Sequence, residues 1–96
     1  MSMHSKTKDE IESILREAFK PVFLEVIDES AQHAGHREAM LHSSAGHFKV
    51  TMKSQKFVGE SLISRHRMVY EKLDDLMKHR IHALSLNLLA IDEYSP

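Results

Sequence analysis

The chain of 96 residues contains no cysteine and no tryptophan, and it has only three glycines and two prolines. Without cysteine there can be no disulfide framework, thiolate zinc site, CxxC redox motif or cysteine nucleophile. With so little glycine and proline there is no flexible or proline-rich linker. Soft-metal chemistry must therefore use the eight histidines or borrow thiolates from a partner.

Long apolar runs are also missing, so we expect no membrane span. The first ten residues are polar and lack the apolar core of a secretory signal, which makes the cytoplasm the expected location. The composition, 42% hydrophobic and 28% charged, is typical of a folded protein. The length predicts a single domain over residues 1–96, with a core from about residue 7 to residue 92.

The net charge of −1 is unevenly distributed along the chain. Residues 1–48 hold five basic and eight acidic residues, whereas residues 49–96 hold eight basic and six acidic ones. Five basic residues form a cluster in the second half: Lys49, Lys53, Lys56, Arg65 and Arg67. This local patch is weaker than the overall positive charge of a protein dominated by phosphate contacts.

The first third of the chain predicts a helix followed by a strand. Apolar residues recur at helical spacing from Ile11 to Phe19, and Thr7 with Glu10 matches a capping box that would begin the helix. Pro21 ends it. Residues 22–28 are apolar on both alternating faces, which predicts a strand covered on both sides. Residues 30–46 follow no period and form a long loop that carries several histidines.

The remainder predicts strand, helix and strand. Residues 47–53 alternate between apolar and polar side chains, and a turn around Gly59 leads to Ser61, a candidate helix cap. Residues 62–80 form one helix, or two with a bend near residues 64–67, and residues 81–89 form the last strand. This order predicts an α+β domain with a three-stranded mixed sheet and helices on one face.

Standard catalytic patterns are missing. The sequence shows no Ser–His–Asp arrangement, P-loop, GxGxxG motif or pair of carboxylates at catalytic spacing, so we expect a protein that is not an enzyme.

The histidines have no standard metal-ligand spacing, and most are expected to be solvated surface residues. His66 lies on an apolar helical stripe, which favours a structural histidine of the core. His82 begins the last strand on the face that continues through leucines, so it is expected at the rim of the core. A rim histidine beside a histidine-bearing loop is a candidate for a two-ligand metal site.

The segment from Gly59 to Arg67 allows a second interpretation, a helix-turn-helix that contacts DNA. Few aromatic residues and a near-neutral charge count against it, and lysines on a strand are usually solvated.

Four motifs together closely resemble the BolA family from about residue 8 to residue 92. They are His47-Phe48-Lys49-Val50, Phe57-Val58-Gly59-Glu60, Arg65-His66-Arg67-Met68-Val69-Tyr70 and Ile81-His82-Ala83-Leu84-Ser85-Leu86. The resemblance implies an α+β fold similar to class II KH domains. The chain has no GxxG loop, which counts against nucleic-acid binding in the KH manner.

The resemblance also implies a partner, a monothiol glutaredoxin that shares a bridging [2Fe–2S] cluster with glutathione and the BolA-like protein. The implied ligands from this chain are His82 and, because cysteine is absent, a loop histidine that corresponds to His33. The loop is longer than is typical of the family, so His36 and His47 remain candidates. We expect no cofactor in the isolated chain, which should be a monomer.

The leading hypothesis is therefore a partner protein in iron–sulfur cluster trafficking or iron regulation. The alternative is a DNA-binding transcriptional regulator that uses Arg65, Arg67, Lys49, Lys53 and Lys56. A third hypothesis is an isolated metal-binding module.

Overall fold

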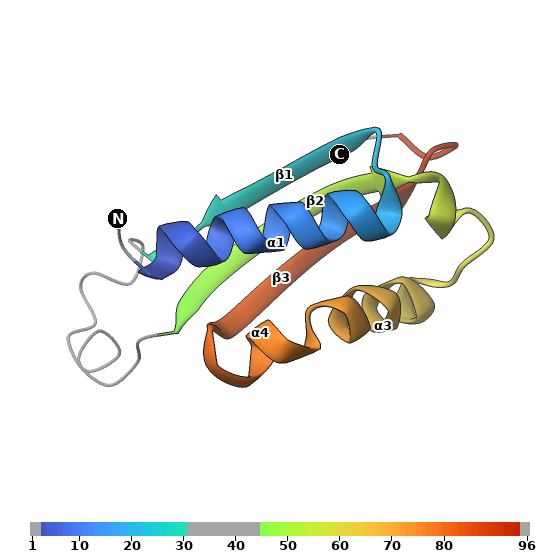
Figure 1. Ribbon diagram of the computed structural model, residues 1–96. Helices are drawn as coiled ribbons and strands as arrows, with labels where there is room; N and C mark the ends of the chain where they lie inside the picture. The colour runs from blue at the N-terminus through green and yellow to red at the C-terminus, as the bar shows by residue number, and fades with distance from the viewer. Residues whose placement is uncertain (1–2, 31–44, 95–96) are drawn as a thin grey trace.

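The computed structural model describes residues 3–30 and 45–94 (Figure 1). The elements follow in this order: α1 (Met3–Phe19), β1 (Phe23–Asp28), β2 (Gly46–Ser54), the short 3-10 turn η2 (Gln55–Phe57), α3 (Leu62–Lys72), α4 (Asp74–His79) and β3 (Ile81–Ala90). Most of the loop expected over 30–46 falls outside these residues. No helix in the described part of the chain is long and apolar enough to cross a membrane.

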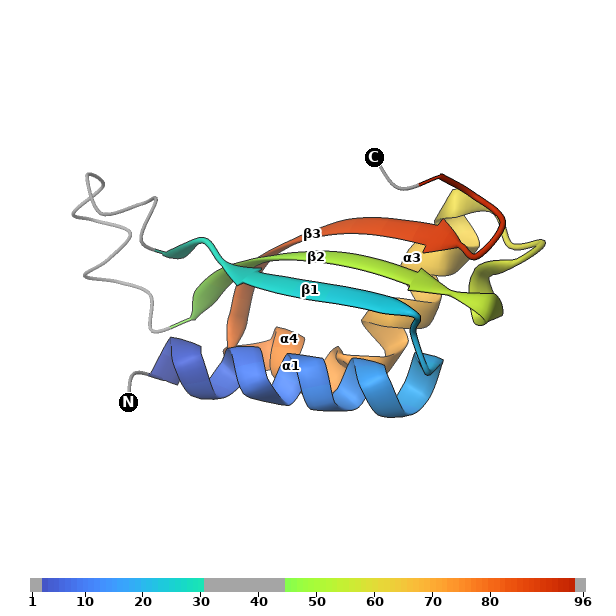
Figure 2. The same ribbon diagram turned by 90° about the horizontal axis from the view of Figure 1, so that it is seen from above.

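The three strands form one mixed sheet in the order β1-β2-β3. β1 and β2 pair antiparallel, and β2 and β3 pair in parallel, because α3 and α4 carry the chain back before β3 begins. Figure 2 shows α1 and α4 on one side of the sheet, with α3 behind the strands in this view. Side chains of α3 reach the outer strand, since Arg65 and Tyr70 donate to carbonyls of β3. Among residues 3–30 and 45–94, no helix lies over the opposite face of β1 and β2, which we call the uncovered face. This arrangement confirms the fold class expected from the sequence.

The core lies between the helices and the sheet. From α1 it takes Ile11, Leu15 and Phe19, the stripe that the helical spacing predicted. The alternation predicted for β2 is also confirmed, since Phe48, Val50 and Met52 are buried while the residues between them are more exposed. The side chains of Phe19 and Phe57 meet with ring centroids 5.2 Å apart, which joins the end of α1 to η2.

The predicted start of the first helix is wrong, because α1 begins at Met3. Thr7 is a buried residue inside the helix, where its hydroxyl donates to the Met3 carbonyl at 2.9 Å. The same hydroxyl accepts from Nε of Arg80 at 2.9 Å, and the Arg80 guanidinium also bonds to Glu10. Thr7 and Glu10 therefore hold α1 to the end of α4 instead of capping the helix.

The expectation that β1 is covered on both faces is also wrong. Its burial alternates, with Val26 buried and Phe23 and Ile27 exposed by 47% and 37%. These exposed side chains lie on the uncovered face, so the apolar side chains on this face of β1 meet solvent.

The helical segment 62–80 is two helices, but they divide at Leu73 and not near residues 64–67. Ser61 is the N-cap of α3, as predicted, and its hydroxyl accepts from the Ser64 amide at 3.1 Å. Ser64 does not begin a second helix. Asp74 and Asp75 instead form the first turn of α4, where carboxylates interact favourably with the positive end of the helix dipole.

α3 buries Val69 and Arg65, the latter with 6% of its surface exposed, whereas His66 is only half-buried. The prediction of His66 as a core histidine is therefore wrong. The Arg65 guanidinium donates to the carbonyls of Glu60 and Leu88 at 2.9 and 3.1 Å and to both carboxylate oxygens of Glu93 at 2.6 and 3.3 Å. A buried cation is tolerated here because the guanidinium is paired with a carboxylate and its other hydrogen bonds go to backbone carbonyl oxygens.

Ser54 holds the end of α1 against β2. Its buried hydroxyl donates to the Phe19 carbonyl at 2.6 Å and accepts from the Lys56 amide at 3.1 Å.

We expect Ser54→Ala to lower the free energy of unfolding by about 1–3 kcal/mol, because a carbonyl at a helix end then loses its buried donor. Urea unfolding measures the change. Ser13→Ala, at an exposed position of α1, is the control, and an equal effect of both substitutions would contradict this role of Ser54.

Glu93 gives stability a dependence on pH. The hydrogen bonds from Arg65 and then from the Ala90 amide hold the pKa of the Glu93 carboxyl below its ordinary 4.5. A lowered pKa in the folded state stabilises the fold above pH 4.5, and this contribution is lost as the pH falls through the folded-state pKa. We expect Glu93→Gln to destabilise the chain at neutral pH, with the difference from the unsubstituted chain shrinking in acid. Urea unfolding across that range measures it, with the exposed Glu71→Gln as control. A difference independent of pH would contradict it.

Candidate histidine site at the start of β2 and β3

His82 lies at an irregularity in the parallel pairing of β2 and β3. Gly46 pairs with Ile81 and His47 pairs with Ala83, so His82 is an extra residue without a partner across the ladder. This β-bulge turns Ile81 into the core and leaves His82 exposed. The expectation that His82 shares the face of Leu84 and Leu86 at the rim of the core is therefore wrong. The bulge sets the side chain where an external ligand can approach.

His47 is the residue that the fold brings to His82. The ring centroids of the two imidazoles are 5.0 Å apart with an angle of 49° between the ring planes. His82 is exposed and His47 is half-buried. They are 35 positions apart in the sequence, and only the parallel pairing of β2 with β3 makes them neighbours.

Hydrogen bonds fix the backbone around His47 to the end of β1. The His47 amide donates to the hydroxyl of Ser30 at 3.1 Å, and the Glu29 amide donates to the His47 carbonyl at 2.7 Å. Ser30 is itself held because its amide donates to the Asp28 carboxylate at 2.9 Å. The two ends of segment 31–44 are thus fastened together beside the histidine pair.

Gly46, the first residue of β2, lets the backbone pass close to the Phe48 ring. A Cβ atom at this position would lie 2.6 and 2.7 Å from the ring carbons Cε2 and Cζ of Phe48. The ring of Phe48 is buried and meets His4 edge-on at a centroid distance of 6.5 Å, so it has no room to withdraw. A glycine is required here for the Phe48 ring to fill the core beneath His47.

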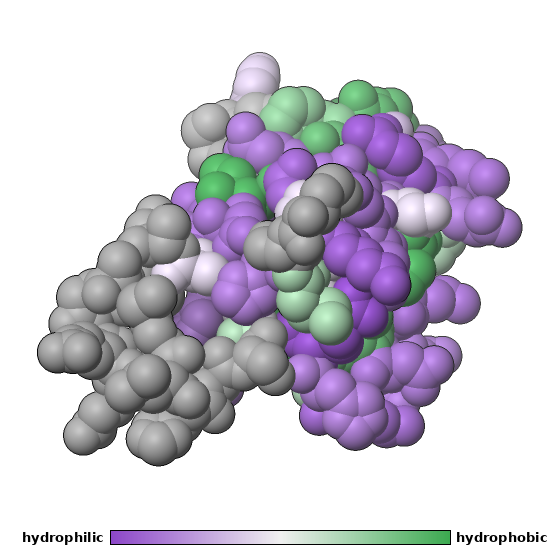
Figure 3. All heavy atoms as spheres, turned by 60° about the vertical axis from the view of Figure 1, so that its left-hand side comes forward, coloured by the Kyte–Doolittle hydropathy of each residue, from purple (hydrophilic) through white to green (hydrophobic). Residues whose placement is uncertain are grey.

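The pair offers two borderline nitrogen ligands at the surface. Neutral imidazole binds Zn, Cu, Ni and Fe, and no group of three or more His, Asp or Glu side chains suited to a metal occurs in the described ranges 3–30 and 45–94. Figure 3 shows this end of the molecule, where hydrophilic side chains predominate and hydrophobic ones form separate small patches. Among the described residues, the pair could therefore supply at most two ligands to a metal, and any further ligands would have to come from elsewhere.

The other candidate ligands fall into two groups. His33 and His36 lie outside the described residues, so their roles stay predictions. His66 lies on α3 and His79 is exposed on α4, and neither takes part in the pair. Sequence reasoning ranked His47 low because spacing along one chain carries no sign of which strands pair in parallel.

The five basic residues do not form one patch. Arg65 is buried, and its side chain is occupied by the contacts to Glu60, Leu88 and Glu93. Lys49 and Lys53 lie on the uncovered face of the sheet, opposite Ile27 and Phe23 of β1. Arg67 is exposed on α3, away from these two lysines in the fold. The helix-turn-helix interpretation is weakened further, since the element before Gly59 is a single turn of three residues.

Three comparisons with known proteins agree with this fold. A family model described as BolA-like protein matches residues 15–93. The DNA-binding transcriptional regulator BolA of Escherichia coli (strain K12) is 42% identical over 87 residues, which cover 91% of this chain and 78% of that protein. SufE-like protein 1, chloroplastic/mitochondrial, of Arabidopsis thaliana is 46% identical over 77 residues, 75% of this chain but only 20% of that much longer protein.

Solved structures give the same result. The BolA domain of SufE1 from Arabidopsis thaliana matches with a TM-score of 0.78 and 38% identity, covering 92% of this chain and 95% of that one. BolA1 from the same plant matches with a TM-score of 0.77 and 30% identity over 92% of this chain and 95% of that one. Since the family model spans most of the chain, and both sequence and structure match its members, the chain belongs to the BolA-like protein family.

Proposed function

We propose that this chain is a non-enzymatic partner of a monothiol glutaredoxin and that the two proteins hold a [2Fe–2S] cluster between them. His82 and a second histidine would be the ligands from this chain. The thiolates of the glutaredoxin and of glutathione would complete the coordination. The role would be in iron–sulfur cluster trafficking or iron regulation in the cytoplasm.

The observation that supports the proposal best is that half-buried His47 lies next to exposed His82 in a chain without cysteine. A cluster normally requires four ligands, commonly thiolates, and imidazoles replace two of them in Rieske centres. Two imidazoles on this side and two thiolates on the other would complete such a set. Exposure of His82 suits a ligand that must be reached by a second protein.

Histidine ligation has consequences for the behaviour of such a complex. Replacing thiolate by neutral imidazole removes negative charge from the cluster and raises its reduction potential. An imidazolium cannot bind iron, so acid weakens attachment on this side of the interface. Both effects favour a cluster that is passed on rather than stored.

Two histidines compete for the second position. The family resemblance implies His33, which lies outside the described residues. The geometry favours His47, whose backbone is fixed and whose ring already neighbours His82. His36 is a third candidate from the sequence.

Anaerobic reconstitution with a monothiol glutaredoxin and glutathione tests the ligands. We expect a coloured heterodimer whose visible absorption and circular dichroism are lost or altered in His82→Ala, because one iron loses its nitrogen ligand. His79→Ala, an exposed histidine three residues earlier, is the control and should leave the spectrum unchanged. An unchanged spectrum in His82→Ala would contradict the proposal.

The same spectra identify the second ligand. Either His33→Ala or His47→Ala should reproduce the change seen in His82→Ala, while the other leaves the spectrum close to that of the unsubstituted chain. If both leave it unchanged and His36→Ala does not, the ligand is His36, and the assignment to His33 and His47 is wrong.

A second candidate function is DNA binding, because the Escherichia coli relative that is 42% identical is named a DNA-binding transcriptional regulator. In this chain, two of the cations that could contact phosphate, Lys49 and Lys53, share the uncovered face of the sheet. Arg65 is excluded as a contact because it is buried and hydrogen-bonded.

Salt dependence tests this candidate. We expect Lys49→Gln and Lys53→Gln each to reduce the slope of log affinity for duplex DNA against log salt by about 0.9, as each removes one phosphate contact. Fluorescence anisotropy with a labelled duplex measures the slope. Lys78→Gln on α4 is the control. No binding to duplex at low salt would remove this candidate.

A further inference from the structure

The outer edge of β3 has backbone groups that β2 does not use. The carbonyls of His47 and Lys53 accept hydrogen bonds from Glu29 and Val22 on the β1 side. Because successive residues of a strand point their backbone groups to alternate sides, Phe48, Val50 and Met52 point theirs toward β3.

The partners of these three residues are Leu84, Leu86 and Leu88. In a parallel pair of strands, only one of two directly opposite residues points its N–H and C=O toward the other strand, and its partner points them to the opposite side. Those groups therefore point to the free edge of the sheet.

Side chains from α3 and the C-terminal turn close both ends of this edge. The Tyr70 hydroxyl donates to the Leu84 carbonyl at 3.4 Å, and Arg65 donates to the Leu88 carbonyl at 3.1 Å. Beyond Leu88, the Ala90 amide donates to the Glu93 carboxylate at 2.7 Å. Between them, Leu86 turns both backbone groups outward, and no side chain of the described residues bonds to them. The middle of the edge is open.

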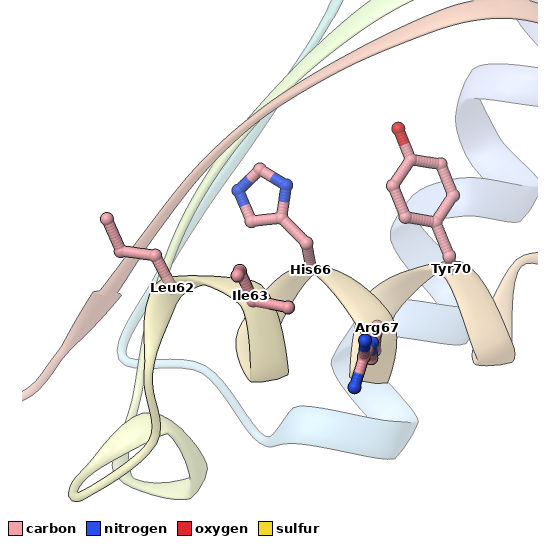
Figure 4. A pocket seen from close by; sticks show the side chains of 5 residues that line it. All are labelled: Leu62, Ile63, His66, Arg67 and Tyr70. Carbon is pink, nitrogen blue, oxygen red and sulfur yellow. The ribbon is translucent and has the colours of Figure 1, made fainter.

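An apolar groove of about 370 Å³ lies on α3 beside this edge. The groove is lined by Leu62, Ile63, His66, Arg67 and Tyr70. Figure 4 shows Leu62, His66 and Tyr70 rising from the same side of the helix. Leu62 and Ile63 are 66% and 67% exposed, and Tyr70 connects the groove to the edge through its bond to the Leu84 carbonyl. Adjacent exposed aliphatic side chains are a feature of binding grooves.

We propose that the free edge of β3 and this groove bind an extended, acidic peptide segment of a partner protein by strand addition. The segment would pair with the backbone of Leu86, and its alternate side chains would lie against α3. The lining includes one guanidinium, Arg67, and no carboxylate. A glutamate or aspartate of the bound segment can therefore form an ion pair with Arg67.

The charge of the groove favours a peptide over a nucleic acid strand. A groove for single-stranded nucleic acid combines several cations with free aromatic faces for base stacking. The lining of this groove has one arginine, Arg67, and no lysine, so it lacks the several cations that would follow a phosphate backbone. The surface does not include the histidine pair, so the inference stands independently of the proposed cluster ligation.

Titration of the labelled chain with a capped heptapeptide of alternating valine and glutamate tests the proposal. We expect amide shifts confined to residues 84–88 and to α3 from 62 to 70, with slower hydrogen exchange at the Leu86 amide, at peptide concentrations up to ~1 mM. The same peptide N-methylated at alternate residues cannot donate to the edge and should bind at least ~10-fold more weakly. Shifts elsewhere, or none, would overturn strand addition.

Charge reversal tests the acidic preference. Arg67→Glu should weaken binding of the valine–glutamate peptide by roughly threefold and strengthen binding of a valine–lysine peptide. Lys72→Glu, on the side of α3 that faces α1, is the matched control and should change neither. Equal binding of both peptides to the unsubstituted chain would refute the acidic preference. A thymidine octanucleotide that displaces the peptide from the same amides would assign the groove to nucleic acid instead.

Discussion

The buried guanidinium of Arg65 joins the helical layer to the C-terminal end of the sheet. From its place in α3 it donates to acceptors in the turn before that helix, in β3 and in the C-terminal turn. Arg65 and Val69 both point inward, which sets the helical phase of α3 and turns Leu62, Ile63 and Arg67 outward. The Arg65 side chain also closes one end of the free edge of β3. The groove on α3 lies on the face that these two buried residues leave exposed.

This constraint also explains where sequence reasoning succeeded and failed. The β2 alternation, the Ser61 cap and the order of strands followed from local patterns, since each depends on residues close in the chain. The stripe predicted for the 62–80 segment is buried at Val69 and Leu73, but the burial of Arg65 was not predicted, because its acceptors are 23 and 28 positions away. An apolar stripe alone selected His66. The true start of α1 was missed for a similar reason, as Thr7 is held by Arg80 from the far end of α4.

The candidate site shows the same limit. His82 was identified from a family motif, but its exposure results from a one-residue bulge that no periodicity reveals. His47 was recognised as a histidine on a polar strand face. That it lies next to His82 could be known only from the register in which β2 and β3 pair, which local sequence patterns do not give. Residue types could be read from the sequence, whereas the distances between them arise from pairing across the sheet.

Hydrogen bonds between Ser30 and His47 hold the ends of β1 and β2 together. The pairing of these strands therefore does not depend on how many residues connect them. The Glu29 and His47 backbones meet directly, and the Asp28 and Ser30 side chains complete a closed base. Above such a base, doubling the number of intervening residues costs only about 0.6 kcal/mol in closure entropy. Insertions or deletions between Ser30 and Ala45 should therefore be tolerated without a change of register. The length of this connection can therefore change while the sheet keeps its register, provided that the candidate ligands His33 and His36 within it are kept.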